Sequence, residues 1–185
     1  MTDGGRSCAA AMDIIGRTES SLAASMEALL GRRPRLRVVS ISRSKTPAWA
    51  VPPLSPEADV LVRWTGYSLE SADLSRHIAA VDLSAIDPGT ATALESGAMA
   101  LTEVLDDPRI QKGGVQVGML GRAGIGGDGL RRSFEARGMS GSLACRRYHF
   151  TMDGVPAGVV IEVLPCEMWE RLTVGSDPAR ARSRR

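Results

Sequence analysis

Aromatic side chains are scarce in this 185-residue sequence: they make up 4% of it, although hydrophobic residues together reach 43%. The core must therefore be mainly aliphatic. No run of about 18 apolar residues occurs, and residues 1–17 lack the basic start and apolar run of a signal peptide. We therefore expect no membrane span, no membrane partner and a cytoplasmic protein.

Cysteine and histidine are also rare. The three cysteines, Cys8, Cys145 and Cys166, are odd in number and fit no metal-site spacing, so they indicate no disulfide framework and a reducing compartment. His77 and His149 lie far apart, without a matching cysteine or carboxylate pattern. The sequence therefore predicts no metal site and no Ser-His-Asp arrangement, and we interpret both histidines as packing or surface residues.

The charges are nearly balanced, with 23 Lys and Arg against 21 Asp and Glu. This balance argues against a nucleic-acid surface over the whole domain. Part of the positive excess lies near the C-terminus, so we interpret residues 173–185 as a disordered basic tail. Residues 1–17 are interpreted as a disordered lead-in. Residues 18–172 then form one domain, as a monomer or a homodimer.

Hydrophobic patterning predicts more strands than helices, and the strands cluster in hairpins. Asp153-Gly154 is a strong hairpin signal, and Ser84 to Asp87 resembles a helix-capping box. The sequence therefore predicts an α+β fold, with an antiparallel sheet of about six strands and helices packed on one side of it. The expected strands are 35–42, 59–67, 71–81, 115–120, 143–152 and 157–164, and the expected helices are 18–30, 88–96, 100–105 and 130–137.

Two charged residues interrupt apolar strand patterns. Arg63 shares a strand face with Leu61, and Glu162 shares one with Val160 and Leu164. If those faces are buried, an anion must meet Arg63 and the pKa of Glu162 must rise, which suits acid/base chemistry. The alternatives are an edge arginine that reaches water and a structural ion pair for Glu162.

Residues 121–129 hold five glycines, and residues 124–129 formally match G-x-G-x-x-G. A dinucleotide site needs βαβ alternation around that motif, which this chain lacks. We interpret the segment as a mobile glycine-rich flap.

Several motifs, taken in order, resemble the chorismate lyase family. They are Leu61-Val62-Arg63-Trp64, the connecting region 81–105, and the hairpin with Arg146-Arg147 on one strand, Gly154-Val155-Pro156 at its turn and Glu162 to Pro165 on the other. The UTRA ligand-sensing domains of GntR-type regulators share this layout. The resemblance covers roughly residues 28–170 and implies a chorismate lyase-like fold with an enclosed pocket under flaps.

The resemblance also implies site residues and an activity. Arg63 and Glu162 would be catalytic, and Arg63, Leu101 and Arg147 would bind a small anionic cyclic carboxylate. The expected enzyme is a carbon-oxygen lyase that eliminates pyruvate from chorismate, or from a related enolpyruvyl compound, to give a hydroxybenzoate. Such an elimination needs no cofactor.

Two other functions stay open. The chain could be a stand-alone UTRA-like binding domain, because the residues before the first expected strand are too few for a DNA-binding part. It could also be a divergent enzyme of secondary metabolism, because residues 106–142 depart from the family pattern.

Overall fold

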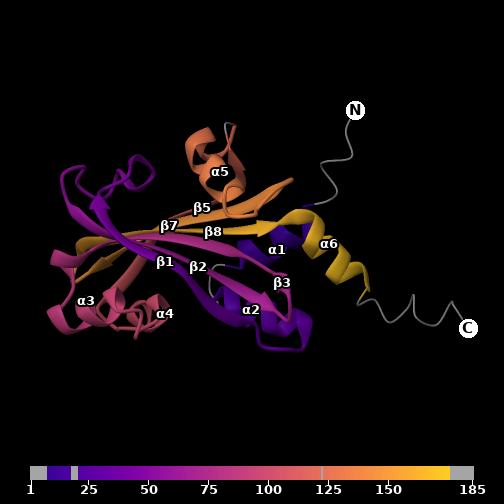
Figure 1. Cartoon of the computed structure of the whole chain (residues 1–185), viewed down its shortest axis with the longest axis horizontal. Helices are drawn as coiled ribbons and strands as arrows, with labels where there is room; N and C mark the ends of the chain where they lie inside the picture. Colours follow the sequence, from indigo (N-terminus) through magenta and orange to yellow (C-terminus); the bar gives the residue numbers. More distant parts are fainter. Residues whose placement is uncertain (1–7, 18–20, 122, 176–185) are drawn as a thin grey trace, which may run out of the picture.

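The computed structural model describes residues 8–17, 21–121 and 123–175 (Figure 1). Its helices are α1 (Ala9–Gly16), α2 (Leu22–Leu30), α3 (Pro88–Glu95), α4 (Leu101–Leu105), α5 (Gly127–Glu135) and α6 (Cys166–Gly175). Its strands are β1 (Arg35–Lys45), β2 (Asp59–Leu69), β3 (Ala72–Asp73), β4 (Arg76–Asp82), β5 (Ile110–Gly121), β6 (Ile125–Gly126), β7 (Leu143–Met152) and β8 (Val155–Pro165).

The long strands form one antiparallel sheet in the order β1-β2-β4-β8-β7-β5. Two-residue strands extend it: β6 runs parallel to β5, and β3 pairs with the end of β2. The α+β class and the six principal strands are therefore confirmed. The strand expected over residues 71–81 is divided into β3 and β4 by a turn.

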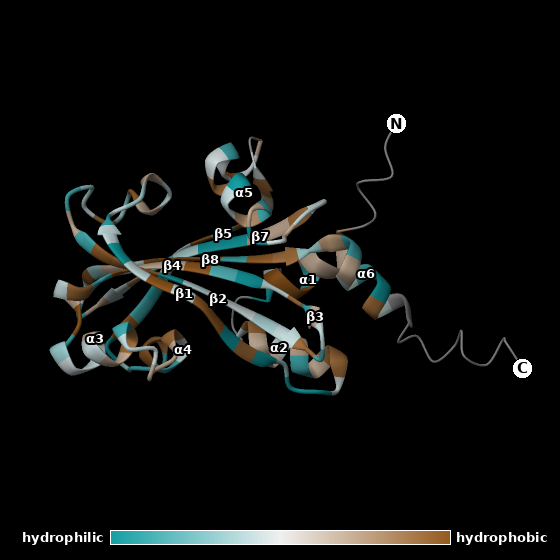
Figure 2. Cartoon of the chain, viewed as in Figure 1, coloured by the Kyte–Doolittle hydropathy of each residue, from teal (hydrophilic) through white to brown (hydrophobic). Residues whose placement is uncertain are grey.

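The central strands are buried on both faces, whereas the edge strands are not. Every residue of β4 from Arg76 to Val81 is buried, and so is β8 from Ala157 to Leu164. Figure 2 shows β8 as largely apolar and α5 as carrying polar residues. Covered on both sides, a central strand needs apolar residues at successive positions, so a charge there requires a partner.

Helices cover both faces of the sheet, so the prediction of helices on one side is wrong. On one face, α3 and α4 pack at one end and α1, α2 and α6 at the other (Figure 1). The opposite face is covered by α5, which packs on Trp64 and Ile78, and by residues of the loop before β2, including Leu54. The first face therefore has a gap between its two groups of helices.

The expected disordered lead-in is wrong for residues 9–16, which form α1, whereas residues 1–7 lie outside the described residues. The apolar side chains Ala11, Ile14 and Ile15 of α1 are buried at helical spacing. A disulfide joins Cys8 to Cys166 at the start of α6, so the expectation of no disulfide is also wrong. This pairing removes the basis on which a reducing compartment was expected. Cys145 is free and buried.

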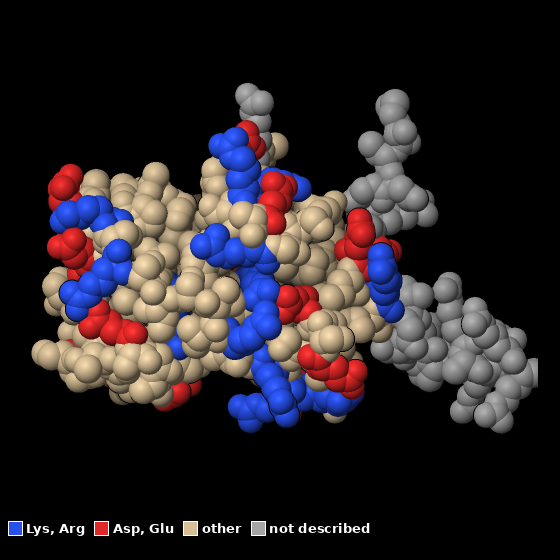
Figure 3. Space-filling view, viewed as in Figure 1, with Lys and Arg blue, Asp and Glu red and all other residues tan. Residues whose placement is uncertain are grey.

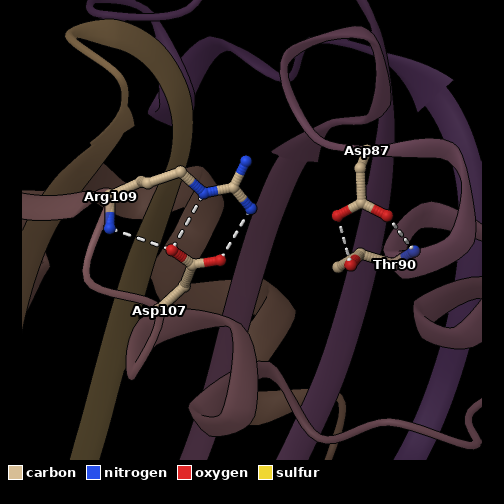
Figure 4. A network of polar contacts seen from close by, with 4 residues as sticks. All are labelled: Asp87, Thr90, Asp107 and Arg109. Atoms are coloured by element: carbon tan, nitrogen blue, oxygen red, sulfur yellow. Dashed lines mark hydrogen bonds and ion pairs between the residues drawn. The ribbon is translucent and has the colours of Figure 1, made fainter.

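Helix α3 begins at a cap other than the predicted one. Asp87, not Ser84, is the N-cap residue, and it accepts hydrogen bonds from the backbone and hydroxyl of Thr90 (Figure 4). Figure 4 also shows Arg109, just before β5, donating hydrogen bonds to both carboxylate oxygens of Asp107. These bonds lower the pKa of Asp107 to about 2. These contacts order the connections around α3 and α4.

The C-terminal prediction is tested only in part. Residues 173–175 belong to α6, so the tail does not begin at residue 173, and residues 176–185 lie outside the described residues. Among the described helices, none is both long and apolar enough to cross a membrane.

The disulfide should be a major source of stability because it closes a loop across 158 positions of the sequence. We expect its reduction to lower the free energy of unfolding by about 2–5 kcal/mol. Denaturant unfolding with and without a dithiol reductant measures this loss. The double variant Cys8→Ala, Cys166→Ala should be equally destabilised and insensitive to reductant, and a parent protein unaffected by reduction would contradict the expectation.

Candidate functional site

A cavity of about 270 Å³ lies between the two groups of helices, on the face of the sheet that α1, α2, α3, α4 and α6 cover. Its floor comes from alternate positions of adjacent strands, because successive side chains of a strand point to opposite faces. The floor residues are Arg63, Thr65 and Tyr67 of β2, His77 and Ala79 of β4, Val160 and Glu162 of β8, and Arg146 and Tyr148 of β7. The walls include Leu36, Lys112, Val115, Arg33 and parts of α2 and α4.

Arg63 is a buried cation without a carboxylate partner. Its residue is 2% exposed, its Nη1 donates to the carbonyl oxygen of Met99 at 2.6 Å, and its Nε has no hydrogen-bond partner. Among the described residues, no carboxylate forms an ion pair with Arg63. Burial therefore lowers the pKa of this guanidinium, and the nearby charge of Glu103 offsets part of that effect. The edge-arginine alternative is excluded.

Glu162 also lies in the cavity, where Arg146 is its partner. Nε and Nη2 of Arg146 lie 2.6 Å and 2.5 Å from Oε2 of Glu162. Arg146 also donates from Nη1 to the carbonyl oxygen of Arg17, after α1, at 3.1 Å. Burial raises the pKa of Glu162, and the charge and hydrogen bond of Arg146 oppose that rise. The ion-pair alternative for Glu162 is thus present, and it is compatible with a position in the pocket.

His77 lies between these charged groups and is not a surface residue. It is opposite Thr65 on β2 and opposite Glu162 on β8. Burial, followed by the charges of Arg146 and Arg76, lowers its pKa to about 3. The imidazole is therefore neutral at pH 7.

The structure brings together three of the four predicted site residues, because Arg63, Leu101 and Glu162 all line the cavity. Their roles stay predictions. Arg147 lies on the opposite face, where its Nη2 donates to the carbonyl oxygens of Pro52 and Trp49. Its assignment to the pocket is wrong, and the arginine that β7 contributes is Arg146.

A bulge explains this error. Met152 pairs with Val155 next to the turn of the β7–β8 hairpin. If that register continued along the two strands, Cys145 would lie opposite Glu162. A register shift at Phe150/Thr151 instead places Arg146 there. Opposite residues of a sheet share a face, so a shift of one residue exchanges the side chains of the two faces.

The glycine-rich segment 121–129 is not a flap over the cavity. It forms β6 and the start of α5, which packs on the opposite face. A Cβ at Gly124 would lie 2.0 Å from the carbonyl oxygen of Met119, and Gly126 has a φ of +80°. Close packing and backbone conformation therefore account for these glycines.

Sequence reasoning missed Thr65, Tyr67, Arg146 and Tyr148, and it gave His77 no role in a pocket. Thr65 and Tyr67 could have been found, because they follow Arg63 at alternate positions of the same strand. Arg146 and Tyr148 could not, because the bulge sets their face. The walls from α2 and α4 arise only from tertiary packing.

The curled, mostly antiparallel sheet with helices and an inner cavity defines an α+β domain, consistent with a chorismate lyase-like or UTRA-like fold. No family model and no curated protein sequence matches this chain. Among solved structures, PhnF from Mycobacterium smegmatis is similar at TM-score 0.51 and 11% identity, over 79% of this chain and 64% of that protein. The similarity to PhnF is one of fold.

Two further similar structures have TM-scores below 0.5. The C-terminal domain of the histidine utilization repressor from Pseudomonas syringae has TM-score 0.49 and 10% identity, over 72% of this chain and 92% of that one. A GntR-family transcriptional regulator from Enterococcus faecalis has TM-score 0.45 and 13% identity, over 71% and 93%.

The buried imidazole predicts a pH dependence of stability. The pKa of His77 is about 3 when folded, below its ordinary 6.5. Neutral His77 therefore stabilises the fold fully above pH 6.5, and this contribution is lost as the pH falls towards 3, because only the unfolded chain takes up the proton. We expect the free energy of unfolding to fall more steeply between pH 7 and pH 4 in the parent protein than in His77→Gln.

Denaturant unfolding at several pH values within that range measures the two slopes. Glu162 titrates in both proteins, so the difference isolates His77. Equal slopes in the parent and His77→Gln would contradict the prediction.

Proposed function

We propose that this chain is a UTRA-like small-molecule-binding domain whose cavity holds a small anionic ligand. The observation that carries the proposal is Arg63, a buried guanidinium that lines the cavity without a carboxylate partner. A buried charge is costly when unpaired, and a ligand carboxylate or phosphate would supply the missing negative charge.

The other charges in the cavity support an anionic ligand. The lining contains four cationic residues, Arg33, Arg63, Lys112 and Arg146, and two acidic ones, Asp106 and Glu162. Because Arg146 and Glu162 neutralise each other, the remaining lining is positive. A cleft lined by one sign of charge concentrates ligands of the opposite sign.

Positive charge continues on the outer surface. Figure 3 shows Lys and Arg side chains in a strip that runs from α5 across β1 towards α2. Exposed arginines at the junction of α2 and β1 include Arg32, Arg33, Arg35 and Arg37, and Arg33 also lines the cavity. This surface would attract an anion towards the cavity.

The walls suit a ligand with an apolar body. Leu36, Leu101, Leu105, Val115 and Val160 line the cavity together with the rings of Tyr67 and Tyr148. Burial, and then the charge of Glu162, raises the pKa of both tyrosines, so both stay neutral donors at pH 7. Apolar walls with a few placed polar groups are typical of small-molecule sites.

A second candidate is the chorismate pyruvate-lyase activity. The observation that favours it is the raised pKa of Glu162 in the same cavity as Arg63. Arg63 would hold a carboxylate, and Glu162 would move the proton that leaves the ring as pyruvate is eliminated. Arg146 opposes this role because its charge and hydrogen bond lower the pKa of Glu162 and so weaken it as a proton acceptor. We therefore rank the binding function first.

Binding of small carboxylates tests the first proposal. Isothermal titration with phenylacetate, phenylglyoxylate and chorismate should show saturable binding to the parent protein. The Arg63→Ala variant should bind about 10–100-fold more weakly, because a charge-assisted hydrogen bond is lost. Arg147→Ala removes a guanidinium of β7 from the opposite face of the sheet and should bind like the parent. Equal losses in both variants, or no binding by the parent, would contradict the proposal.

Turnover tests the second candidate. If the protein is a lyase, chorismate should yield pyruvate and an aromatic product that absorbs in the ultraviolet. Glu162→Gln should then reduce the rate about 10²–10⁴-fold, the usual contribution of a placed proton-transfer group. If chorismate raises the thermal stability of the protein but is not converted, the result would support binding without lyase activity.

A further inference from the structure

A series of hydrogen bonds in the cavity floor connects the backbone N–H of Tyr67, through Ser75 and His77, to the hydroxyl of Thr65. The backbone N–H of Tyr67 donates to Oγ of Ser75 at 3.3 Å. Oγ of Ser75 lies 2.9 Å from Nε2 of His77, and Nδ1 of His77 lies 3.4 Å from Oγ1 of Thr65. Ser75 is fully buried, whereas Thr65 and His77 line the cavity.

The direction of each bond follows from the position of each hydrogen. Ser75 is fully buried, and among the described residues Nε2 of His77 is the one contact that could accept its hydroxyl hydrogen. If Nε2 carried a proton, that buried hydrogen would have no acceptor, so we infer that Nε2 is the unprotonated ring nitrogen. A neutral imidazole carries its single hydrogen on the other nitrogen. Nδ1–H of His77 then donates to Oγ1 of Thr65.

The hydroxyl hydrogen of Thr65 then has no acceptor among the residues that the structure describes. Its oxygen accepts from His77, so its own hydroxyl hydrogen points elsewhere, and the cavity is the space that it lines. Burial, followed by the charges of Arg146 and Arg76, keeps His77 neutral. The direction of these hydrogen bonds is therefore unchanged near pH 7.

We propose that Thr65 is a specificity-determining hydrogen-bond donor of this cavity, oriented by Ser75 and His77, and that it selects ligands with an oxygen acceptor beside the anionic group held by Arg63. Arg63 and Thr65 are alternate residues of β2 on one face, so one ligand can reach both. Ser75 and His77 are positioning residues that act through Thr65. The inference rests on the proposed anion site and specifies its chemistry.

The tautomer of His77 tests the direction of these hydrogen bonds in the ligand-free protein. Two-dimensional ¹⁵N–¹H spectra distinguish the protonated from the unprotonated ring nitrogen, and His149→Gln assigns the signals because the chain has two histidines. We expect the Nδ1–H form in the parent and a change of tautomer or a mixture in Ser75→Ala. An Nε2–H form in the parent would overturn the proposal.

Selectivity between two matched acids tests the role of Thr65. Phenylglyoxylate has a carbonyl oxygen beside its carboxylate, and phenylacetate has a methylene group there. The parent should bind phenylglyoxylate about fivefold more tightly, the effect of one neutral hydrogen bond. Thr65→Val, which removes the hydroxyl with little change in shape, should bring the ratio close to one, and Thr65→Ser should restore it.

These experiments distinguish failure of the anion site at Arg63 from failure of the selectivity role of Thr65. Arg63→Ala should weaken both acids and keep their ratio, whereas Ser75→Ala should lower the ratio and keep the affinity for phenylacetate. An unchanged ratio in Thr65→Val would overturn the inference but leave the anion site intact. No binding of either acid by the parent would overturn the anion site and the inference together.

Discussion

A carboxylate in the middle of a sheet that is covered on both faces must find a cation, and Glu162 finds Arg146 across the β7–β8 hairpin. Arg146 in turn binds the carbonyl oxygen of Arg17, so the pair also attaches the end of α1 to the sheet. Removing either partner would leave the other charge buried and unpaired. The pair therefore constrains both the hairpin register and the position of the N-terminal helix.

Arg63 shows the opposite solution to the same constraint. It is as buried as Arg146, yet its one hydrogen-bond acceptor is a backbone carbonyl rather than a carboxylate. The positive charge is thus kept in a cavity that two groups of helices leave open between them. Since Glu162 is paired with Arg146, none of the carboxylates in the described part of the chain neutralises Arg63, and the anionic ligand proposed above would supply that charge.

Neutral groups complete the floor between these charges. His77 lies in register with both Thr65 and Glu162, and burial keeps it uncharged. A charged imidazole beside Arg146 would add a second cation to a dry site. The neutral ring instead sets the direction of hydrogen bonds along β2 and β4. The proposed site therefore combines one cationic side chain, Arg63, with neutral hydrogen-bonding groups.

The sequence by itself determined the α+β class, the principal strands and the apolar neighbours with which Arg63 and Glu162 share strand faces. Alternation along single strands was enough for these, because a strand's period of two is local. It could not determine α1, which depends on a disulfide to Cys166 and on packing against α6, or the cap at Asp87 rather than Ser84.

The tertiary structure alone decided which arginine meets Glu162 and where the cavity lies. Because of a single bulge at Phe150/Thr151, Arg146 rather than Arg147 lies on the cavity face of β7. No local sequence pattern marks the position of this bulge. The cavity is the space between helices that are distant in the sequence. Pairing across strands and packing between helices are properties of the assembled sheet, which is why the sequence showed the neighbours of each charge along its own strand but did not identify its partner.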